Sequence, residues 1–419
     1  MPFKKHGRTY DLVLFGATGY TGAYTADYVS KNLPTDLKWA IAGRSREKLA
    51  KVAADLKKQN PDRLQPGLEI CSVNDDELAQ LAKKTAVLIS TVGPYGAHGE
   101  PAFKACAENG THYVDVTGEV PFVARMIRTY EAACKASGAL MFPQSGIESA
   151  PADIAAAEVA RVIRTELGAK TAEVTASLRL KALPSGGTLD TVLTAFDNFS
   201  IRELRSTLAP YALSPVPRPN GHRGNPSLLS YLTGVVSVRH LGTLTTSLFG
   251  STNAAQVERT WGLLSSLPGR GAEAYGPNFS FAEYARARNW LKAVQMHWSL
   301  AIGSFLLATF PPFRWLAKRY VFAPGTGPNR ENARKDVTEY RAVGKPDTEN
   351  PTKVAFTTAT FRGSMYDLTG ILASEAALAI LLDDLKLEGG VYTPSLLGPK
   401  FIERLGEAGF KYETKLIDA

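Results

Sequence analysis

One short run near the N-terminus, Gly16-Ala-Thr-Gly19-Tyr-Thr-Gly22, constrains the fold more than any other part of the chain. It directly follows a buried-strand pattern over 10–15 and opens a stretch with apolar residues at helical spacing. In such a strand–turn–helix unit, the glycines allow a tight turn, a close approach of the backbone to a pyrophosphate, and close packing of helix on strand. The run therefore predicts a dinucleotide site whose binding residues are Gly16, Thr18, Gly19, Tyr20, Thr21 and Gly22.

The end of the second strand pattern indicates which dinucleotide is bound. An NAD-specific fold commonly has a carboxylate there for the ribose hydroxyls, whereas this chain has Arg44 and Ser45. A guanidinium binds a 2′-phosphate through two hydrogen bonds and stacks on an adenine ring. The sequence therefore favours NADPH over NADH, with Arg44 and Ser45 as binding residues. A solvated surface position for Arg44 is the alternative.

A further glycine-containing turn, Ser90-Thr91-Val92-Gly93-Pro94-Tyr95, follows the fourth strand pattern. Ligands of open α/β sheets bind at the carboxyl ends of the strands. We therefore expect Thr91 and Gly93 to lie near the nicotinamide ribose. Tyr95 is a candidate proton donor, although a wall of the pocket is the better interpretation of its position.

The first 150 residues alternate apolar runs with helical patterns, as repeated strand–helix units do. Strand patterns recur at 10–15, 38–42, 68–73, 86–91, 112–116 and 139–143. Helix-like stretches lie between them. This alternation predicts an α/β fold in which residues 1–150 form an NADP-binding Rossmann domain, a doubly wound parallel sheet.

The pattern changes after Asp153. Residues 174–182 alternate between apolar and polar side chains, which is typical of a strand with one covered face, and residues 353–361 have a similar pattern. We therefore expect a second α/β domain, the substrate domain, over 151–389, built on a mixed or antiparallel sheet. The last stretch, 390–419, contains a Gly-Gly turn and an amphipathic helix, and we expect it to return to the first domain.

Charge and cysteine content narrow the range of partners. The formal net charge of +8 is spread over 419 residues without a basic tract that carries interleaved aromatic residues, so no nucleic-acid partner is expected. Three cysteines without CxxC spacing indicate neither a disulfide framework nor a zinc site, and no metal is expected. Because no apolar signal segment precedes the first strand, we expect an intracellular, cytoplasmic protein. A homodimer stays open.

Several blocks together resemble the saccharopine dehydrogenase-like family, especially its trans-acting enoyl reductase branch. They are LFGATGYTG, AGRS, STVGPYGAHGEPAFKACAENGTHYVDVTGE and GIESAPADI, with further similarity at SGGT, GGVYTPSLLG and LGEAGFKYE. The resemblance implies a Rossmann domain joined to a substrate domain, use of NADPH, and reduction of a lipid- or polyketide-type substrate. One turn departs from the family pattern GFDS.PSD, because Ile147 and Glu148 replace an aromatic residue and an aspartate.

Acidic residues at two later strand ends are candidates for proton transfer, since hydride transfer itself belongs to the cofactor. Asp115, Thr117 and Glu119 follow the fifth strand pattern, and Glu119 can donate a proton if burial raises its pKa. A helix N-cap is the alternative for Thr117 and Glu119. Glu148, at the crossover between the domains, completes the catalytic candidates beside Tyr95 and Glu119.

The run 299–310 is strongly apolar and is followed by two prolines and a basic segment. It is shorter than the about 20 apolar residues of a membrane-spanning helix. A buried core helix, an anchor that lies on a membrane or lipid droplet, and a wall of a substrate tunnel are the three interpretations of the segment 296–320. Trp298, Trp315 and Arg314 favour the anchor slightly, because a core helix does not need such residues.

These observations lead to one hypothesis and two alternatives. The leading hypothesis is an NADP-dependent oxidoreductase of the trans-acting enoyl reductase type, which reduces a C=C bond of an acyl, lipid or polyketide-like substrate, free or carrier-bound. The first alternative is a C=N reductase of the imine or saccharopine type. The second is a catalytically idle NADP-binding protein that docks on membranes or lipid droplets.

Overall fold

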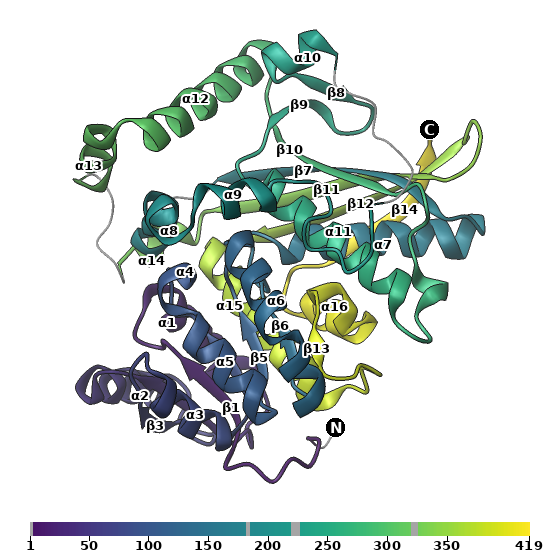
Figure 1. The fold of residues 1–419 in the computed structure, drawn as a ribbon. Coiled ribbons are helices and arrows are strands. Elements are labelled where there is room, and N and C mark those ends of the chain that lie inside the picture. The colour runs from purple at the N-terminus through teal and green to yellow at the C-terminus, as the bar shows by residue number, and fades with distance from the viewer. Residues whose placement is uncertain (1–2, 182–184, 219–226, 320–325) are drawn as a thin grey trace.

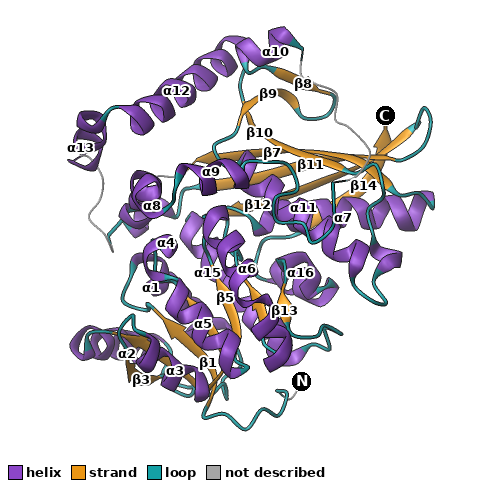
Figure 2. Cartoon of the chain, viewed as in Figure 1, coloured by secondary structure: helices purple, strands orange, loops and turns teal. Residues whose placement is uncertain are grey.

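The chain forms two β-sheets with helices packed between and around them, as the computed structural model shows (Figure 1). The structure describes residues 3–181, 185–218, 227–319 and 326–419. Sheet A lies in the lower half of the view and sheet B in the upper half (Figure 2).

Sheet A consists of β1 (Tyr10–Phe15), β2 (Trp39–Gly43), β3 (Gly67–Ile70), β4 (Thr85–Ser90), β5 (His112–Asp115), β6 (Leu140–Phe142) and β13 (Gly390–Val391). Their order is β13-β6-β5-β4-β1-β2-β3, and all neighbours are parallel. The predicted doubly wound parallel sheet is confirmed. Because the strand order reverses between β1 and β4, a crevice is expected at the carboxyl ends of these two strands.

Helices cover both faces of sheet A. They are α1 (Tyr20–Asn32), α2 (Arg46–Gln59), α3 (Asp75–Lys83), α4 (Tyr95–His98), α5 (Glu100–Asn109), α6 (Val120–Ser137) and α15 (Met365–Leu382). Strand β1 shows why both faces need covering: Leu12 and Leu14 enter the core that α1 and α15 share, whereas Val13 and Phe15 enter the core formed with α3, α5 and α6. A strand that is buried on both faces has a continuous apolar run, as this one does.

Sheet B consists of β7 (Thr171–Lys181), β8 (Val236–Val238), β9 (Gly242–Thr246), β10 (Ser280–Arg286), β11 (Val337–Pro346), β12 (Lys353–Arg362) and β14 (Tyr412–Asp418). Their order is β14-β12-β11-β7-β10-β9-β8, in which β7 and β10 are parallel and the other neighbours antiparallel. The predicted mixed sheet is confirmed. Of the strand expected over 174–182, Ala182 lies outside the described residues.

The helices associated with sheet B are α7 (Ala150–Leu167), α8 (Gly186–Asn198), α9 (Ile201–Thr207), α10 (Leu228–Thr233), α11 (Gly250–Ser266), α12 (Trp290–Thr309), α13 (Pro311–Arg319) and α14 (Arg330–Ala333), with a short 3-10 turn at Gly271–Glu273. Helix α7 packs against β11, β12 and β14, and α11 packs against β10 and α7. Helices α12 and α13 instead extend along the outer side of the molecule as an arm (Figure 1).

The C-terminal part of the chain contributes to both sheets. Strand β13 pairs with β6 in sheet A, and a 3-10 turn at Pro394–Leu397 and helix α16 (Pro399–Glu407) follow it. Strand β14 then pairs with β12 in sheet B. The segment 390–419 therefore does not return as a whole to the first domain, because its last strand covers the free edge of β12.

Helix α15 packs against sheet A, and the sequence patterns did not predict this. It lies within the segment 151–389, yet it packs against α1, β4 and β5. Among the described helices it alone is long and apolar enough to cross a membrane by length and composition, and 89% of that window is buried inside the protein. Here it therefore forms part of the core.

Candidate functional site

The glycine turn joins β1 to α1 at the carboxyl edge of sheet A. Gly16 has a φ of +95°, and a Cβ there would lie 2.7 Å from Thr91 Oγ1, so glycine is needed. A Cβ on Gly22 would overlap with the carbonyl oxygen of Gly16. Helix α1 begins at Tyr20, and its N-cap residue Gly19 offers no side-chain cap. The N–H groups of the first turn are thus left for an anion, as in a pyrophosphate site.

The end of β2 lies next to this turn. A Cβ on Gly43 would lie 4.0 Å from Thr18 Oγ1, which places the two loops in contact. Arg44 is exposed, and no described residue forms an ion pair with it. Ser45 caps α2, because its Oγ accepts a hydrogen bond from the Lys48 N–H at 3.3 Å. Arg44 is therefore free to bind a phosphate, whereas the Ser45 hydroxyl also has a structural role.

The loop after β4 lies on the other side of the glycine turn. Thr91 Oγ1 donates to the Phe15 carbonyl at 3.1 Å, which holds the ends of β1 and β4 together. Gly93 is exposed in this loop. The Tyr95 hydroxyl donates to the Ser90 carbonyl at 2.8 Å, and its ring is buried. Tyr95 therefore forms a wall of the loop, and its proton is directed into the protein.

The predicted cofactor-binding residues thus gather on three loops at one edge of sheet A. They are Gly16, Thr18, Gly19, Tyr20, Thr21 and Gly22 after β1, Arg44 and Ser45 after β2, and Thr91 and Gly93 after β4. Their contacts with a dinucleotide stay a prediction.

Glu119 holds the short helix α4. Its Oε1 accepts the N–H of Tyr95 at 2.6 Å, and its Oε2 accepts the N–H of Gly96 at 2.9 Å. Burial raises the pKa of Glu119, and these two N–H groups counteract the rise. Thr117 Oγ1 accepts the N–H of Glu119 at 3.0 Å. The Glu119 side chain therefore caps α4, and not α6, the helix that it precedes.

Asp115 fixes two loops from within the protein. Its Oδ1 accepts the N–H of Thr117 at 3.0 Å and the N–H of Gln144 at 2.9 Å. Burial raises the pKa of Asp115 to about 7. Gln144 is fully buried with a φ of 57°, and sequence reasoning missed it. Its position directly after β6, at the same sheet edge, was the available signal.

Glu148 differs from these acids because its carboxylate has no hydrogen-bond partner among the described residues. Glu148 keeps some contact with solvent. Burial, and then the negative charge of Glu119, raise the pKa of Glu148 to about 7. A Cβ on Gly118 would overlap with Glu148 Oε2, so the glycine makes room for this carboxylate. Glu148 therefore lies against the loop that follows β5.

Residues from later in the chain contact the start of α1. The Tyr20 hydroxyl donates to the Pro328 carbonyl at 2.6 Å. The Tyr20 ring packs edge-on against Tyr366, with ring centroids 4.9 Å apart, and the Tyr366 hydroxyl accepts the Ser185 N–H at 2.6 Å. Sequence reasoning missed these contacts because their partners are far apart in the chain.

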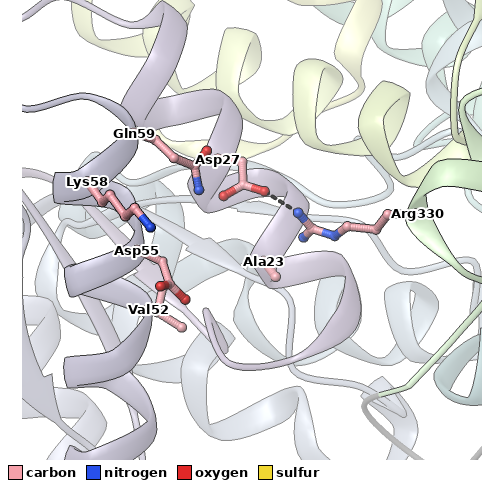
Figure 3. A pocket seen from close by; sticks show the side chains of 7 residues that line it. All are labelled: Ala23, Asp27, Val52, Asp55, Lys58, Gln59 and Arg330. Carbon is pink, nitrogen blue, oxygen red and sulfur yellow. Dashed lines mark hydrogen bonds and ion pairs between the residues drawn. The ribbon is translucent and has the colours of Figure 1, made fainter.

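A polar cavity of about 500 Å³ lies between α1 and α2 (Figure 3). It is lined by Ala23, Asp27, Val52, Asp55, Lys58, Gln59 and Arg330. Arg330 forms an ion pair with Asp27 and lies over the Tyr24 ring, 4.1 Å from its centroid. The lining comes from the bodies of the helices and not from the strand ends, so this cavity lies beside the predicted dinucleotide site.

The parallel sheet, its glycine turn and the uncapped start of α1 define a dinucleotide-binding oxidoreductase with a second, mixed-sheet domain. Residues 12–142 match the family model for the saccharopine dehydrogenase NADP binding domain. The protein is thus an NADP-binding oxidoreductase, and the expected family and NADPH cofactor are confirmed. The glycine-lined turn, and Arg44 with no ion-pair partner in the described part of the chain, fit a phosphate-bearing dinucleotide.

Similarity to relatives extends along the whole chain. It is 28% identical over 440 residues to a saccharopine dehydrogenase-like oxidoreductase of Rattus norvegicus, with 97% of each chain covered. It is 27% identical over 439 residues to a trans-acting enoyl reductase of Mycobacterium ulcerans, with 96% of this chain and 97% of the relative covered. A solved saccharopine dehydrogenase (L-Glu forming) of Saccharomyces cerevisiae shares the fold, with a TM-score of 0.56 at 14% identity over 97% of this chain and 100% of the other.

Proposed function

We propose that the protein uses NADPH to reduce the C=C bond of an α,β-unsaturated acyl, lipid or polyketide-like thioester, and that Glu148 supplies the proton. The observation that carries the proposal is the Glu148 carboxyl group, which lies at the carboxyl edge of sheet A without a hydrogen-bond partner among the described residues. The similarity to a trans-acting enoyl reductase supports the reaction type.

The loops at the sheet edge offer distinct groups for the parts of the cofactor. The glycine turn leaves space and free N–H groups for the pyrophosphate, and Arg44 suits the 2′-phosphate. When bound, NADPH supplies the hydride that is added to one carbon of the double bond. Thr91 and Gly93 line the edge where the nicotinamide ribose is expected.

The protein must deliver one proton to the other carbon of the double bond, next to the thioester carbonyl. Glu148 can hold this proton because its pKa is raised to about 7. Its contact with solvent allows the carboxylate to regain a proton after each turnover. Glu119 and Tyr95 are less suited, since the carboxylate of the first and the hydroxyl of the second are engaged with backbone groups.

Reduction of a C=N bond is the second candidate, since the saccharopine dehydrogenase of Saccharomyces cerevisiae has the same fold. A saccharopine-type substrate carries several carboxylates, which need free basic groups. Arg125 of α6 is paired with Glu203 at 2.9 Å, and Arg330 is paired with Asp27. Carboxyl groups with raised pKa values also fit a neutral substrate better than a cationic imine. These observations favour the C=C reaction.

The test is NADPH oxidation, followed by absorbance, with medium- and long-chain 2-enoyl thioesters, and with a 2-oxo acid plus an amine. We expect turnover with the enoyl thioesters. The product should be the saturated thioester, with one more hydrogen on each carbon of the former double bond. The saturated thioester itself is the control and should give no turnover. Turnover only with the carbonyl plus amine would reassign the protein to C=N reduction. NADPH binding without turnover on either substrate class would favour the idle, docking protein.

A further inference from the structure

Helices α12 and α13 form an arm whose described hydrogen bonds to sheet B lie in the first half of α12, and α13 packs against α8. Thr245 Oγ1 donates to the Ala293 carbonyl at 2.8 Å, and Thr246 shares a hydrogen bond with the His297 ring at 2.8 Å. Ala293 is the only buried side chain among those described in α12. The helix then extends outward and is followed by α13 (Figure 1). The second half of α12 is thus not a core helix.

One exposed face of α12 carries a stripe of large apolar side chains. Leu291, Trp298, Ile302 and Phe305 follow one another at intervals of seven, four and three residues, which places them on one face of the helix. Leu291 is 70% exposed, Ile302 53% and Phe305 64%. Large apolar side chains are also exposed nearby at Phe310, Trp315 and Leu316, and on the adjoining α10 at Leu228, Leu229, Tyr231 and Leu232. Exposed apolar side chains that gather on adjoining helices in this way indicate a binding surface.

The charge of this part of the chain indicates what it binds. No Asp or Glu occurs between Glu283 and Glu331, whereas the arm and the residues just before it contain Arg288, Lys292, Arg314, Lys318 and Arg319. A second copy would bring the same basic segment to the contact and be repelled. An anionic lipid surface offers negative headgroups for the basic residues and acyl chains for the apolar stripe.

The composition of α12 also indicates how it would lie. By length and composition, α12 is not apolar enough to cross a membrane. Polar residues such as Gln295, Ser299 and Ser304 alternate with the apolar stripe, and two prolines follow at the end of the helix. Tryptophan side chains such as Trp298 and Trp315 are favoured at the boundary between headgroups and acyl chains. These features suit a helix parallel to the membrane plane.

We propose that the arm formed by α12 and α13 binds the surface of an anionic phospholipid bilayer, with the stripe Leu291, Trp298, Ile302 and Phe305 inserted at the headgroup level. This proposal does not depend on the reaction that the dinucleotide domain catalyses. It selects the interfacial anchor from the three interpretations of segment 296–320, of which residue 320 lies outside the described residues.

The test is flotation of the full chain with vesicles of phosphatidylcholine alone and of phosphatidylcholine with phosphatidylserine. We expect binding to the mixed vesicles that weakens at high salt, and we expect the double variant Ile302→Asp/Phe305→Asp to lower the partition coefficient by about tenfold or more. The control variant Ile201→Asp/Leu208→Asp changes two exposed apolar residues, at the start of α9 and at its C-cap, and should bind as the unchanged chain does. NADPH binding reports whether each variant is folded.

Three results would overturn the proposal. The first is equal flotation of the Ile302→Asp/Phe305→Asp variant, which would exclude the stripe. The second is equal binding to neutral vesicles, which would exclude the anionic lipid. The third is that the folded chain binds neither kind of vesicle. In that case, loss of a dimer in sedimentation experiments with the Ile302→Asp/Phe305→Asp variant would assign the surface to a contact between two copies.

Discussion

At the scale of single residues, Glu119 and Glu148 show how neighbouring groups decide what an acidic side chain does. Both follow strand ends and both were predicted as catalytic candidates. Contacts separate them: the Glu119 carboxylate accepts the N–H groups of Tyr95 and Gly96, whereas Glu148 has no such partner among the described residues. The sequence could not distinguish them, because the partners of Glu119 lie more than twenty residues earlier in the chain.

Replacing Glu148 by glutamine should lower the turnover of an enoyl thioester by about 10²- to 10⁴-fold, because the amide cannot donate a proton as an acid does. NADPH binding should be unchanged. The raised pKa of about 7 sets the direction of the pH effect. The donor is protonated below this pH, so turnover of the unchanged protein should fall as the pH rises through about 7, and this limb should be absent in Glu148→Gln.

Two further variants separate proton transfer from a structural effect. Glu148→Asp keeps a carboxyl group and should retain a pH-dependent limb at lower turnover. Gly118→Ala should also lower turnover, since the added Cβ overlaps with Glu148 Oε2 and displaces the carboxylate. A glutamine variant with the same pH profile as the unchanged protein would exclude Glu148 as the proton donor.

Arg44→Asp should weaken NADPH binding by about tenfold to a hundredfold, since it removes charge-assisted hydrogen bonds to the 2′-phosphate and adds a repulsive charge. NADH binding should change much less. Calorimetric titration with both cofactors measures the difference. Arg46→Asp, at the exposed residue two positions on, is the matched control. Equal loss of both cofactors would contradict the assignment of Arg44.

At the scale of the elements, the short helix α4 depends on one side chain from another loop. Glu119→Ala leaves the N–H groups of Tyr95 and Gly96 without their carboxylate, and we expect the free energy of unfolding to fall by about 2–4 kcal/mol. Urea unfolding measures this change. Glu108→Ala, an exposed acid on α5, should change stability by less than about 0.5 kcal/mol. A similarly small change in the free energy of unfolding for both variants would show that water replaces the Glu119 carboxylate at these N–H groups.

The elements also differ in how well the sequence predicts them. Strands β1 and β7 were predicted because their apolar runs or alternations reflect which faces are covered, and this pattern is local. Helix α15 was not predicted to belong to sheet A. It is apolar on nearly all sides, and its place depends on a close approach to α1, where a Cβ on Gly370 would lie 3.2 Å from the backbone of Thr25. Contacts over such a separation leave no periodic signal.

At the scale of the whole molecule, neither sheet is complete without the last part of the chain. Sheet A takes α15 and β13 from it, and sheet B takes β12 and β14. Asp153, at the start of α7, also connects the C-terminal segment to the rest of the chain. Its Oδ2 accepts the Ser395 N–H at 2.8 Å, and its Oδ1 accepts a hydrogen bond from the Thr260 hydroxyl. The two domains are therefore joined by more than a linker.

A fragment of residues 1–168 should accordingly lose cooperative unfolding and NADPH binding, although it contains the glycine turn and Arg44. Without α15, the core face of β1 and β4, with Leu12, Leu14 and Ile89, is exposed to water. Addition of residues 363–419 as a separate chain should restore some binding. Thermal unfolding and calorimetry measure both effects. NADPH binding by the fragment alone, at the affinity of the full chain, would contradict this expectation.

The division of the C-terminal segment between both sheets has a consequence for how the protein is made in the cell. Strand β13 can pair with β6 only after β7 to β12 of sheet B have been synthesised, and β14 emerges later still. The nascent chain therefore cannot finish one domain and then begin the next, and the edges of β6 and β12 stay unpaired until β13 and β14 have been made. A premature stop before β13 would thus leave two unfinished sheets, so we expect such products to need chaperones and to be degraded.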